Sequence, residues 1–353
     1  MLKVNDFFCG AGGMGLGFKQ AGFQLAGAWD FDKYAVKSYS SNVSSRVKQA
    51  DITRMSWDEI PYADVWTFGF PCQDISIAGK KNGMIKGKTR SGLFYEIMRL
   101  LEETEKNNRD HLPSIILAEN VKAVKTYLPV IEKEYEARGY KMYAILYNSK
   151  YWGLPQQRDR FFVLGVHKSI GEEFYFKEQQ TDFIPKLSSI LEENVDDKYY
   201  IPKDKAKAII EQAMKRVDLI GTHACLTPNR VDKRQNGRRA KSNEEEMFTL
   251  TAQDRHGVII VVDNPDNKKQ NNIIDIYNTK EITDCFDVRL LTTREYARLQ
   301  GFPDEYQQVV SDSQFFKQMG NAVSVPVAKG IAETINNWLV GLEHGVVSNI
   351  ANS

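Results

Sequence analysis

A cysteine on a turn of glycine and proline is the residue of this sequence best placed for chemistry. Gly69-Phe70-Pro71-Cys72-Gln73 directly follows Val65 to Phe68, an apolar run that predicts a buried strand. A thiol presented at a strand end in this way serves as a nucleophile more often than as packing. Three later segments indicate what the thiol acts on: Glu119-Asn120-Val121, Gln157-Arg158-Asp159-Arg160 and Gly320-Asn321-Ala322-Val323.

A glycine-rich turn, DFFCGAGGMG from Asp6 to Gly15, follows a predicted first strand. Its glycines allow the backbone to approach a ligand closely and open a helix N-terminus to that ligand. Gly10, Gly12 and Gly15 fit the pattern GxGxxG, and Asp30 lies where a carboxylate can accept hydrogen bonds from ribose hydroxyls. This motif alone fits a nicotinamide enzyme, an enzyme that binds a nucleoside sulfonium compound, or a turn that only packs.

The order of predicted elements indicates an α/β protein with a doubly wound, mostly parallel sheet and a second, smaller, irregular β-rich domain. Residues 1–180 and about 318–353 are predicted to form the first domain, about 181–290 the second, and about 291–317 a connecting segment. The expected strands are Val4 to Phe8, Phe23 to Ala28, Val65 to Phe68, Ile115 to Ala118, Met142 to Tyr147, Phe161 to Val166 and Val258 to Val262. The expected helices begin near Met14 or cover Leu93 to Lys106, Leu128 to Arg138, Thr293 to Gln300 and about Pro326 to Leu342.

Composition excludes several classes of protein. The chain has 353 residues, of which 42% are hydrophobic and 26% charged, and its net charge is +1, so a wholly basic nucleic-acid binder is excluded but a local basic face is not. No apolar run approaches the roughly 20 residues that span a bilayer, and no secretory leader is recognised, so we expect a cytoplasmic protein. The four cysteines are far apart and form no CxxC pair, which argues against a metal site or a disulfide framework.

Six motifs, in order from residue 6 to residue 323, resemble those of the cytosine-5 DNA methyltransferase family. They are DFFCGAGG, GFPCQ, ENV, QQRDR, RLLTTREYARLQGFP and QMGNAV. The resemblance implies a Rossmann-like, S-adenosylmethionine-dependent fold whose second domain recognises DNA. It implies an enzyme of the bacterial or phage restriction-modification type that methylates carbon-5 of cytosine in a specific duplex sequence. A monomer with a companion restriction endonuclease is expected.

The resemblance also implies the catalytic residues. The Cys72 thiolate would add to carbon-6 of a cytosine, which makes carbon-5 nucleophilic. Glu119 would supply a proton near ring nitrogen 3, and burial would raise its pKa to suit that role. Arg160 would reach the 2-keto oxygen, with Arg158 supporting the same site. No side chain is an evident base for the carbon-5 proton, and a water or hydroxide is one candidate.

S-adenosylmethionine is the cofactor that the resemblance implies. Asp30 stands where the family commonly has Glu, and Phe31 where it commonly has Trp, so the ribose contact is expected to be looser or water-bridged. The residues that correspond to the family's cofactor site are Phe8, Gly10, Gly12, Gly13, Asp30, Phe31, Asp51, Ile52, Pro71, Leu93, Asn321 and Val323.

Two basic segments are expected to contact double-stranded DNA. The loop from Ser76 to Arg90 has three glycines and no acid, and we expect it to close over a cytosine that has flipped out of the helix. Residues 226–241 hold six Lys or Arg and one acid, which suits phosphate contacts. The candidate DNA-binding residues are Gln73, Ser76, Lys80, Lys81, Arg90, Arg230, Arg234, Arg238, Arg239, Gln253 and Arg255.

Three alternatives remain beside this interpretation. A nicotinamide oxidoreductase would leave PCQ, ENV and RDR without roles. An RNA cytosine-5 methyltransferase would use the same catalytic set, although a separate polar domain of about a hundred residues favours duplex DNA. A DNA-binding relative without activity is disfavoured because Cys72, Glu119 and Arg160 are all present.

Overall fold

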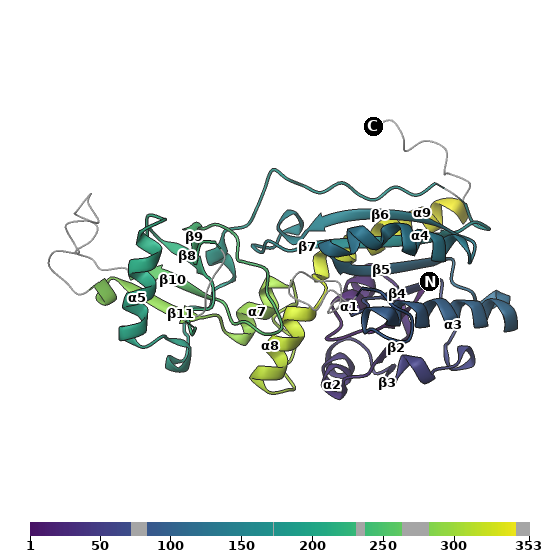
Figure 1. The fold of residues 1–353 in the computed structure, drawn as a ribbon, viewed down its shortest axis with the longest axis horizontal. Helices are drawn as coiled ribbons and strands as arrows, with labels where there is room; N and C mark the ends of the chain where they lie inside the picture. Colours follow the sequence, from purple (N-terminus) through teal and green to yellow (C-terminus); the bar gives the residue numbers. More distant parts are fainter. Residues whose placement is uncertain (72–82, 172, 231–236, 263–281, 344–353) are drawn as a thin grey trace.

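The computed structural model of the chain describes residues 1–71, 83–171, 173–230, 237–262 and 282–343. In these ranges the strands form a seven-stranded sheet and a four-stranded sheet, which lie in the larger and the smaller half of the molecule in Figure 1. Helices α7 and α8 lie between the two sheets in that view.

The larger sheet has the strand order β3-β2-β1-β4-β5-β7-β6. Neighbouring strands from β3 to β5 are parallel, whereas β7 runs antiparallel to both β5 and β6. The strands are β1 (Lys3–Phe7), β2 (Gln24–Asp30), β3 (Val47–Gln49), β4 (Val65–Phe68), β5 (Ile115–Val121), β6 (Tyr140–Asn148) and β7 (Asp159–His167).

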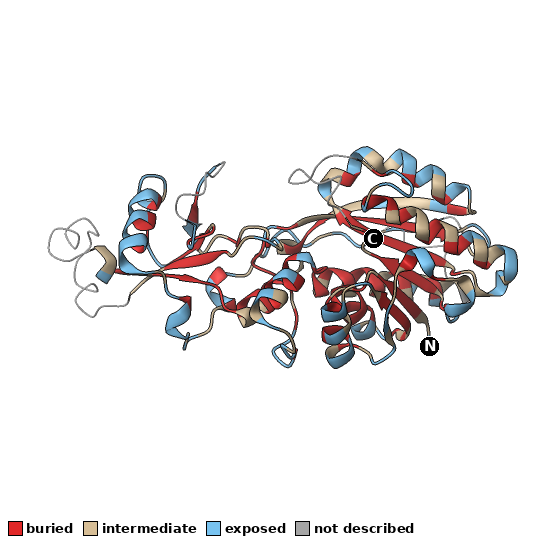
Figure 2. Ribbon diagram, turned by 60° about the horizontal axis from the view of Figure 1, so that its bottom comes forward, coloured by how far each residue is buried: buried red, intermediate tan, exposed pale blue. Residues whose placement is uncertain are grey.

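Both faces of this sheet are buried, and each strand contributes to both because successive strand residues point to opposite sides. In β4, Val65 belongs to a hydrophobic cluster on one face, and Trp66 and Phe68 belong to a second cluster on the other face. Figure 2 shows the strands buried over most of their length and the exposed residues gathered on the outward sides of the helices. The helices of this half are α1 (Gly13–Gln20), α2 (Lys33–Asn42), α3 (Phe94–Asn107), α4 (Leu128–Glu136) and α9 (Val325–Glu343).

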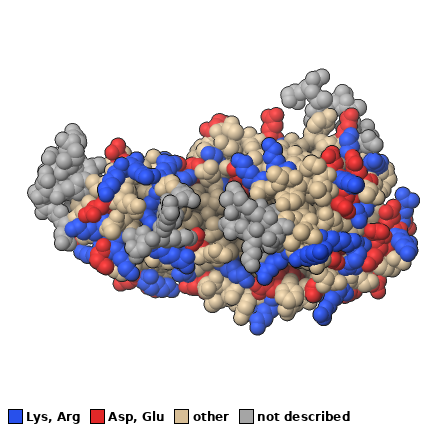
Figure 3. Space-filling view, in the orientation of Figure 1, with Lys and Arg blue, Asp and Glu red and all other residues tan. Residues whose placement is uncertain are grey.

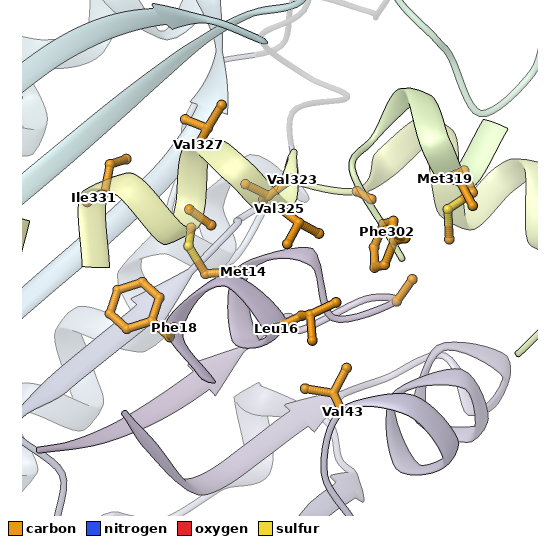
Figure 4. Close-up of a cluster of buried hydrophobic side chains, with 14 of the residues drawn as sticks. Met14, Leu16, Phe18, Val43, Phe302, Met319, Val323, Val325, Val327 and Ile331 are labelled. Carbon is orange, nitrogen blue, oxygen red and sulfur yellow. The ribbon is translucent and has the colours of Figure 1, made fainter. Parts of the chain in front are cut away.

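Apolar spacing explains how the helices attach. Helix α3 buries Phe94, Ile97, Met98 and Leu101, which lie on one helical face at intervals of three and four residues. Helix α9 comes last in the described chain, yet it returns to pack on α1, as Figure 4 shows for the side chains around Met14 and Phe18.

The smaller sheet is antiparallel, with the order β11-β10-β8-β9. Helix α5 (Lys203–Met214) packs its buried Ile209 and Ile210 against this sheet. The connection from the larger sheet runs as an extended segment along the top of Figure 1, where the Asn148 amide donates to the Gln179 side chain over 2.7 Å. The strands are β8 (Thr222–Cys225), β9 (Ala240–Asn243), β10 (Gly257–Val261) and β11 (Phe286–Leu290).

Helices α7 (Thr293–Leu299) and α8 (Asp312–Asn321) follow β11. A capping box begins α7, because the Thr292 side chain accepts from the Glu295 amide and Glu295 accepts from the Thr292 amide. The Glu295 carboxylate also forms a buried ion pair with Arg289 of β11, at 2.7 Å from Oε1 to Nη2. This pair fixes α7 to the end of the smaller sheet.

The predicted fold class is confirmed, since the larger sheet is parallel-dominated and the smaller is antiparallel. The predicted domain boundaries near residues 180, 290 and 318 stay a prediction. Sequence patterns did not indicate the short polar strand β3 or the helices α2 and α8. Among the described residues, no helix combines the length and the apolar character that crossing a membrane requires.

Candidate active site

The glycine turn, Asp30, Glu119 and Arg160 lie at one edge of the larger sheet, where the parallel strands β1, β2, β4 and β5 end. Ligands of doubly wound sheets bind outside the carboxyl ends of their strands. Because β7 is antiparallel to β5, its first residues also lie at this edge, and the register pairs Arg160 with Val121.

The glycine turn after β1 has a fixed, unusual backbone. Phe8 has φ 53° and Gly12, which precedes α1, has φ 92°, so both are in the left-handed region. Such a conformation costs a non-glycine residue roughly 1–3 kcal/mol and is retained at functional sites. A Cβ on Gly13 would overlap the backbone carbonyl of Val323, so the turn and the 320–323 segment touch backbone to backbone.

Asp30, at the end of β2, binds this turn directly. Its Oδ2 accepts from the Gly10 amide and its Oδ1 from the Asp32 amide, both over 2.8 Å. Burial raises the pKa of Asp30, and the two amide hydrogen bonds offset part of that rise. Each carboxylate oxygen keeps a lone pair for a ribose hydroxyl. The neighbouring Phe31 is 73% exposed, a degree rare for a phenyl ring and suited to stacking on a purine.

Asp51 and Ile52 lie near the sheet edge, just after β3. The Asp51 Oδ1 accepts from the Thr53 hydroxyl at 2.7 Å and the Thr53 amide at 3.0 Å, and these bonds lower the pKa of Asp51. Ile52 is buried and begins a short 3-10 helix, Ile52–Arg54. Asp51 is therefore ionised and can accept further hydrogen bonds.

The remaining candidate cofactor residues lie on three other segments. The Pro71 carbonyl accepts from the Ser91 hydroxyl at 2.7 Å, and Leu93 directly precedes α3. Asn321 ends α8 and is exposed, whereas Val323 is buried.

A buried acid beneath the glycine turn was missed by the sequence analysis. Asp6 is 1% exposed and accepts from the Thr67 hydroxyl at 2.9 Å and the Tyr39 hydroxyl at 3.2 Å. Burial raises the pKa of Asp6 to about 7, with these hydrogen bonds and that of the Gly15 amide acting in the opposite direction. The signal was present, because an acid within an apolar strand needs a partner.

Glu119 and Arg160 form an ion pair at the ends of β5 and β7, with 3.1 Å between Oε1 and Nε. Both side chains are mostly buried. Burial raises the pKa of the Glu119 carboxyl, and the nearby Arg160 and Arg158 guanidinium groups offset part of this rise. Beside them, Asn120 donates to the Phe70 carbonyl over 2.9 Å and so ties β5 to the turn that leads to Cys72.

Arg158 occupies a different position from Arg160. It is 1% exposed, and its guanidinium donates to the backbone carbonyls of Leu250, Gly320 and Ala322 over 2.9–3.0 Å. These contacts join Arg158 to the segment of Leu250 and to the segment of Gly320 and Ala322. They leave no exposed face of the guanidinium for a substrate.

Six of the predicted residues lie outside the described residues, among them the candidate nucleophile. They are Cys72, Gln73, Ser76, Lys80, Lys81 and Arg234.

The described DNA-binding candidates separate into exposed and buried groups. Arg90 and Gln253 are exposed, and Arg230, half exposed, pairs with Asp254 at 3.2 Å. Arg238 pairs with Glu245, while Arg255 lies over the Phe316 ring at 3.8 Å. In Figure 3, Lys and Arg side chains gather on the viewer's face over both halves of the molecule.

Arg239, in contrast, is buried within the smaller half. It is 4% exposed and donates to the Gln212 side chain at 2.9 Å. It also donates to the carbonyls of Leu226, Thr227 and Arg230. In this arrangement Arg239 supports the basic segment from behind and presents no face to DNA.

The strand order defines a doubly wound α/β protein with a glycine-rich turn at the carboxyl end of its first strand. The chain belongs to the C-5 cytosine-specific DNA methylase family, whose model matches residues 2–337. The type II methyltransferase M.NlaX of Neisseria lactamica is 32% identical over 94% of this chain and 96% of its own length. The orphan methyltransferase M.SPBetaI of Bacillus phage SPbeta is 29% identical over 97% and 99%.

A likeness in structure agrees with the family. The solved structure of the S. pombe Dnmt2 methyltransferase has a TM-score of 0.66 at 18% identity and covers 97% of this chain and 99% of its own. At that identity the likeness shows the fold alone. The family match confirms the resemblance of the six motifs and the prediction of a methyltransferase.

Proposed function

We propose that this protein transfers a methyl group from S-adenosylmethionine to carbon-5 of a cytosine in a specific duplex DNA sequence. The observation that carries the proposal is the buried Glu119–Arg160 pair beside the turn that leads to Cys72. A proton donor and a guanidinium held together are what a cytosine ring needs when a nucleophile adds to it.

The residues of the chain would act in sequence. The Cys72 thiolate bonds to carbon-6 of a cytosine that has flipped out of the duplex, and its electrons pass through the ring to carbon-5. Burial raises the pKa of Glu119, which favours its role as a hydrogen-bond donor to ring nitrogen 3, while Arg160 binds the 2-keto oxygen that gains charge. After carbon-5 is methylated, it loses its proton to a base, and the carbon-6–sulfur bond breaks to release the Cys72 thiolate.

The residues at the sheet edge fit the cofactor. Bound there, S-adenosylmethionine supplies an electrophilic methyl group. Asp30 would accept from the ribose hydroxyls and Phe31 would stack on the adenine, whose edge would meet Asp51 and Ile52. The other residues proposed to hold it are Phe8, Gly10, Gly12, Gly13, Pro71, Leu93, Asn321 and Val323.

DNA would contact basic side chains on both halves. Arg90, on the larger half, and Arg230 and Arg238, near the smaller sheet, present cations that can meet phosphates. We propose that Gln253 and Arg255 lie near the base edges, because they belong to an exposed or half-exposed segment that precedes β10. A companion endonuclease, a monomeric state and a cytoplasmic location remain proposals, the first prompted by relatives named type II methyltransferases.

The test is methyl transfer from tritiated S-adenosylmethionine to mixed-sequence duplex DNA, with tRNA as a parallel substrate. We expect label in 5-methylcytosine of the duplex, and a denaturation-resistant adduct with duplexes that contain 5-fluorocytosine. The Cys72→Ser variant should form neither while still binding DNA. Label in tRNA alone would replace DNA by RNA as the substrate, and an adduct with Cys72→Ser would remove Cys72 from the mechanism.

A further inference from the structure

Arg158 lies where three segments of the proposed site meet. It directly precedes β7, whose second residue is Arg160. One Nη donates to the carbonyl of Leu250 at 3.0 Å, and the other donates to Gly320 at 3.0 Å and Ala322 at 2.9 Å. A planar guanidinium can serve three acceptors in fixed directions, which an ammonium cannot.

The segments that Arg158 joins also touch each other through their backbones. A Cβ on Gly320 would overlap the carbonyl of Thr251 and lie 2.6 Å from the Ala252 amide nitrogen. The same 320–323 segment also touches the glycine turn, because the carbonyl of Val323 leaves no room for a Cβ on Gly13. The chain thus makes a continuous backbone path from the cofactor residues to the segment that leads to Gln253 and Arg255.

Buried side-chain amides secure the same junction. Gln156 accepts from the Leu250 amide at 3.0 Å and donates to the Leu299 carbonyl at 2.8 Å. Gln300 donates to the Met319 carbonyl at 2.6 Å and accepts from the Ser324 hydroxyl at 2.9 Å. Packed elements held by such buried networks have few alternative arrangements.

We propose that Arg158 is a positioning residue that fixes residues 249–252 and residues 320–323 to the strand of Arg160, so that a filled cofactor site and a correctly placed recognition segment favour each other. The inference rests on the proposed function for the identity of cofactor and DNA. Such coupling is reciprocal, because each ligand must change the other's affinity by the same factor.

The first experiment compares Arg158→Lys with a matched control, Arg138→Lys. Arg138 also donates to backbone carbonyls, those of Met98 and Glu134 at 2.9 Å, but it lies between α3 and α4. Kinetics are measured at least 10 degrees below each melting temperature. Arg158→Lys should raise KM for both cofactor and DNA about tenfold, as expected for lost charged hydrogen bonds, and lower kcat by less than about threefold.

The control should lower the melting temperature and leave both KM values unchanged. A fall in kcat alone for Arg158→Lys would make Arg158 a catalytic residue and overturn the proposal. A lower melting temperature with unchanged KM values would make its role merely structural and overturn it as well.

The second experiment uses the unaltered protein and so does not depend on a variant that folds. Amide hydrogen exchange is followed with and without S-adenosylhomocysteine. We expect exchange to slow in the glycine turn, in residues 320–323 and, although no cofactor atom is proposed to touch it, in residues 249–255. Protection of the turn without residues 249–255 overturns this inference, whereas no protection in the turn contradicts the proposed cofactor site itself.

Discussion

The Glu119 carboxylate lies 3.1 Å from the Arg160 guanidinium because one strand of the larger sheet runs against its neighbour. Glu119 approaches the end of β5, and Arg160 is the second residue of β7, which pairs with β5 in antiparallel register. Were β7 parallel, its first residues would lie at the opposite edge. The reversal therefore brings Glu119 and Arg160 together at the edge where β4 also ends.

Glu119→Gln should lower the single-turnover rate of methyl transfer by about 10²–10⁴-fold, the usual contribution of a general acid. Because burial raises the pKa of Glu119, the unaltered enzyme keeps its proton donor to higher pH than an ordinary Glu would, and its rate falls as pH rises through that pKa. The variant should lack this alkaline limb. Equal rates for the two proteins would exclude Glu119 as the acid, and cofactor affinity serves as the control because it should not change.

Asp30→Ala should weaken binding of S-adenosylhomocysteine by about 10–100-fold, measured by titration calorimetry without DNA. The change removes the proposed ribose acceptor and the partner of the Gly10 and Asp32 amides. Asp58→Ala, at an exposed position in the same half, is the control. Unaltered affinity in Asp30→Ala would place the ribose elsewhere.

Asp6→Asn should change how stability depends on pH. Burial raises the pKa of Asp6 to about 7, so the folded protein holds a proton that the unfolded chain releases near pH 4. Its contribution to the free energy of unfolding, on the order of a few kcal/mol, is thus full below about pH 4 and is lost as pH rises to about 7. The groups that face Asp6 are Tyr39, Thr67, Cys9 and Asp30.

Urea unfolding between pH 4 and pH 9 measures this effect. The stability difference between Asp6→Asn and the unaltered protein should shift in favour of the variant up to about pH 7 and then stay level. A difference that is independent of pH would show that Asp6 does not titrate in this range.

Arg230→Ala and Arg239→Ala should have different effects, because Arg230 is proposed to contact DNA whereas Arg239 stabilises the fold. Arg230 is half exposed, so its loss should weaken DNA binding and reduce the slope of log affinity against log salt by about one unit. Arg239 is buried against four partners, so its loss should destabilise the smaller half by about 1–3 kcal/mol. DNA binding over a salt series and urea unfolding distinguish the two effects. Lower stability in Arg230→Ala together with weaker DNA binding alone in Arg239→Ala would contradict the roles inferred from their burial.

Much of the fold could be predicted from the sequence, because both faces of the larger sheet are buried and apolar runs mark its strands. The predicted strands at Val65 to Phe68 and Ile115 to Ala118 correspond to β4 (Val65–Phe68) and β5 (Ile115–Val121). The edge strand β3 was missed because its residues, Val-Lys-Gln, are mostly polar and number only three. A short exposed strand has no apolar pattern to reveal it.

Residue types and motifs could predict which residues belong to the site, but not how those residues are arranged in space. The family motifs indicated Glu119 and Arg160, which border the predicted strands Ile115 to Ala118 and Phe161 to Val166, but the sequence did not show the antiparallel pairing that brings them together. The resemblance assigned Arg158 to the catalytic site, and the basic segment 226–241 suggested that Arg239 contacts DNA, because the burial of a basic residue cannot be read from the sequence. Only the packed chain shows that both donate to backbone carbonyls.

The packing of α9 on α1 has a consequence for how the protein is made. Residues 21–324, a stretch of 304 residues, separate the two helices, so at roughly 5–20 residues per second the ribosome needs about 15–60 s to deliver the second helix after the first. Throughout that interval Met14 and Phe18 lack the apolar cover shown in Figure 4. A nascent chain therefore exposes this apolar surface until α9 has been synthesised, and a stop codon just before Val325 should yield insoluble protein.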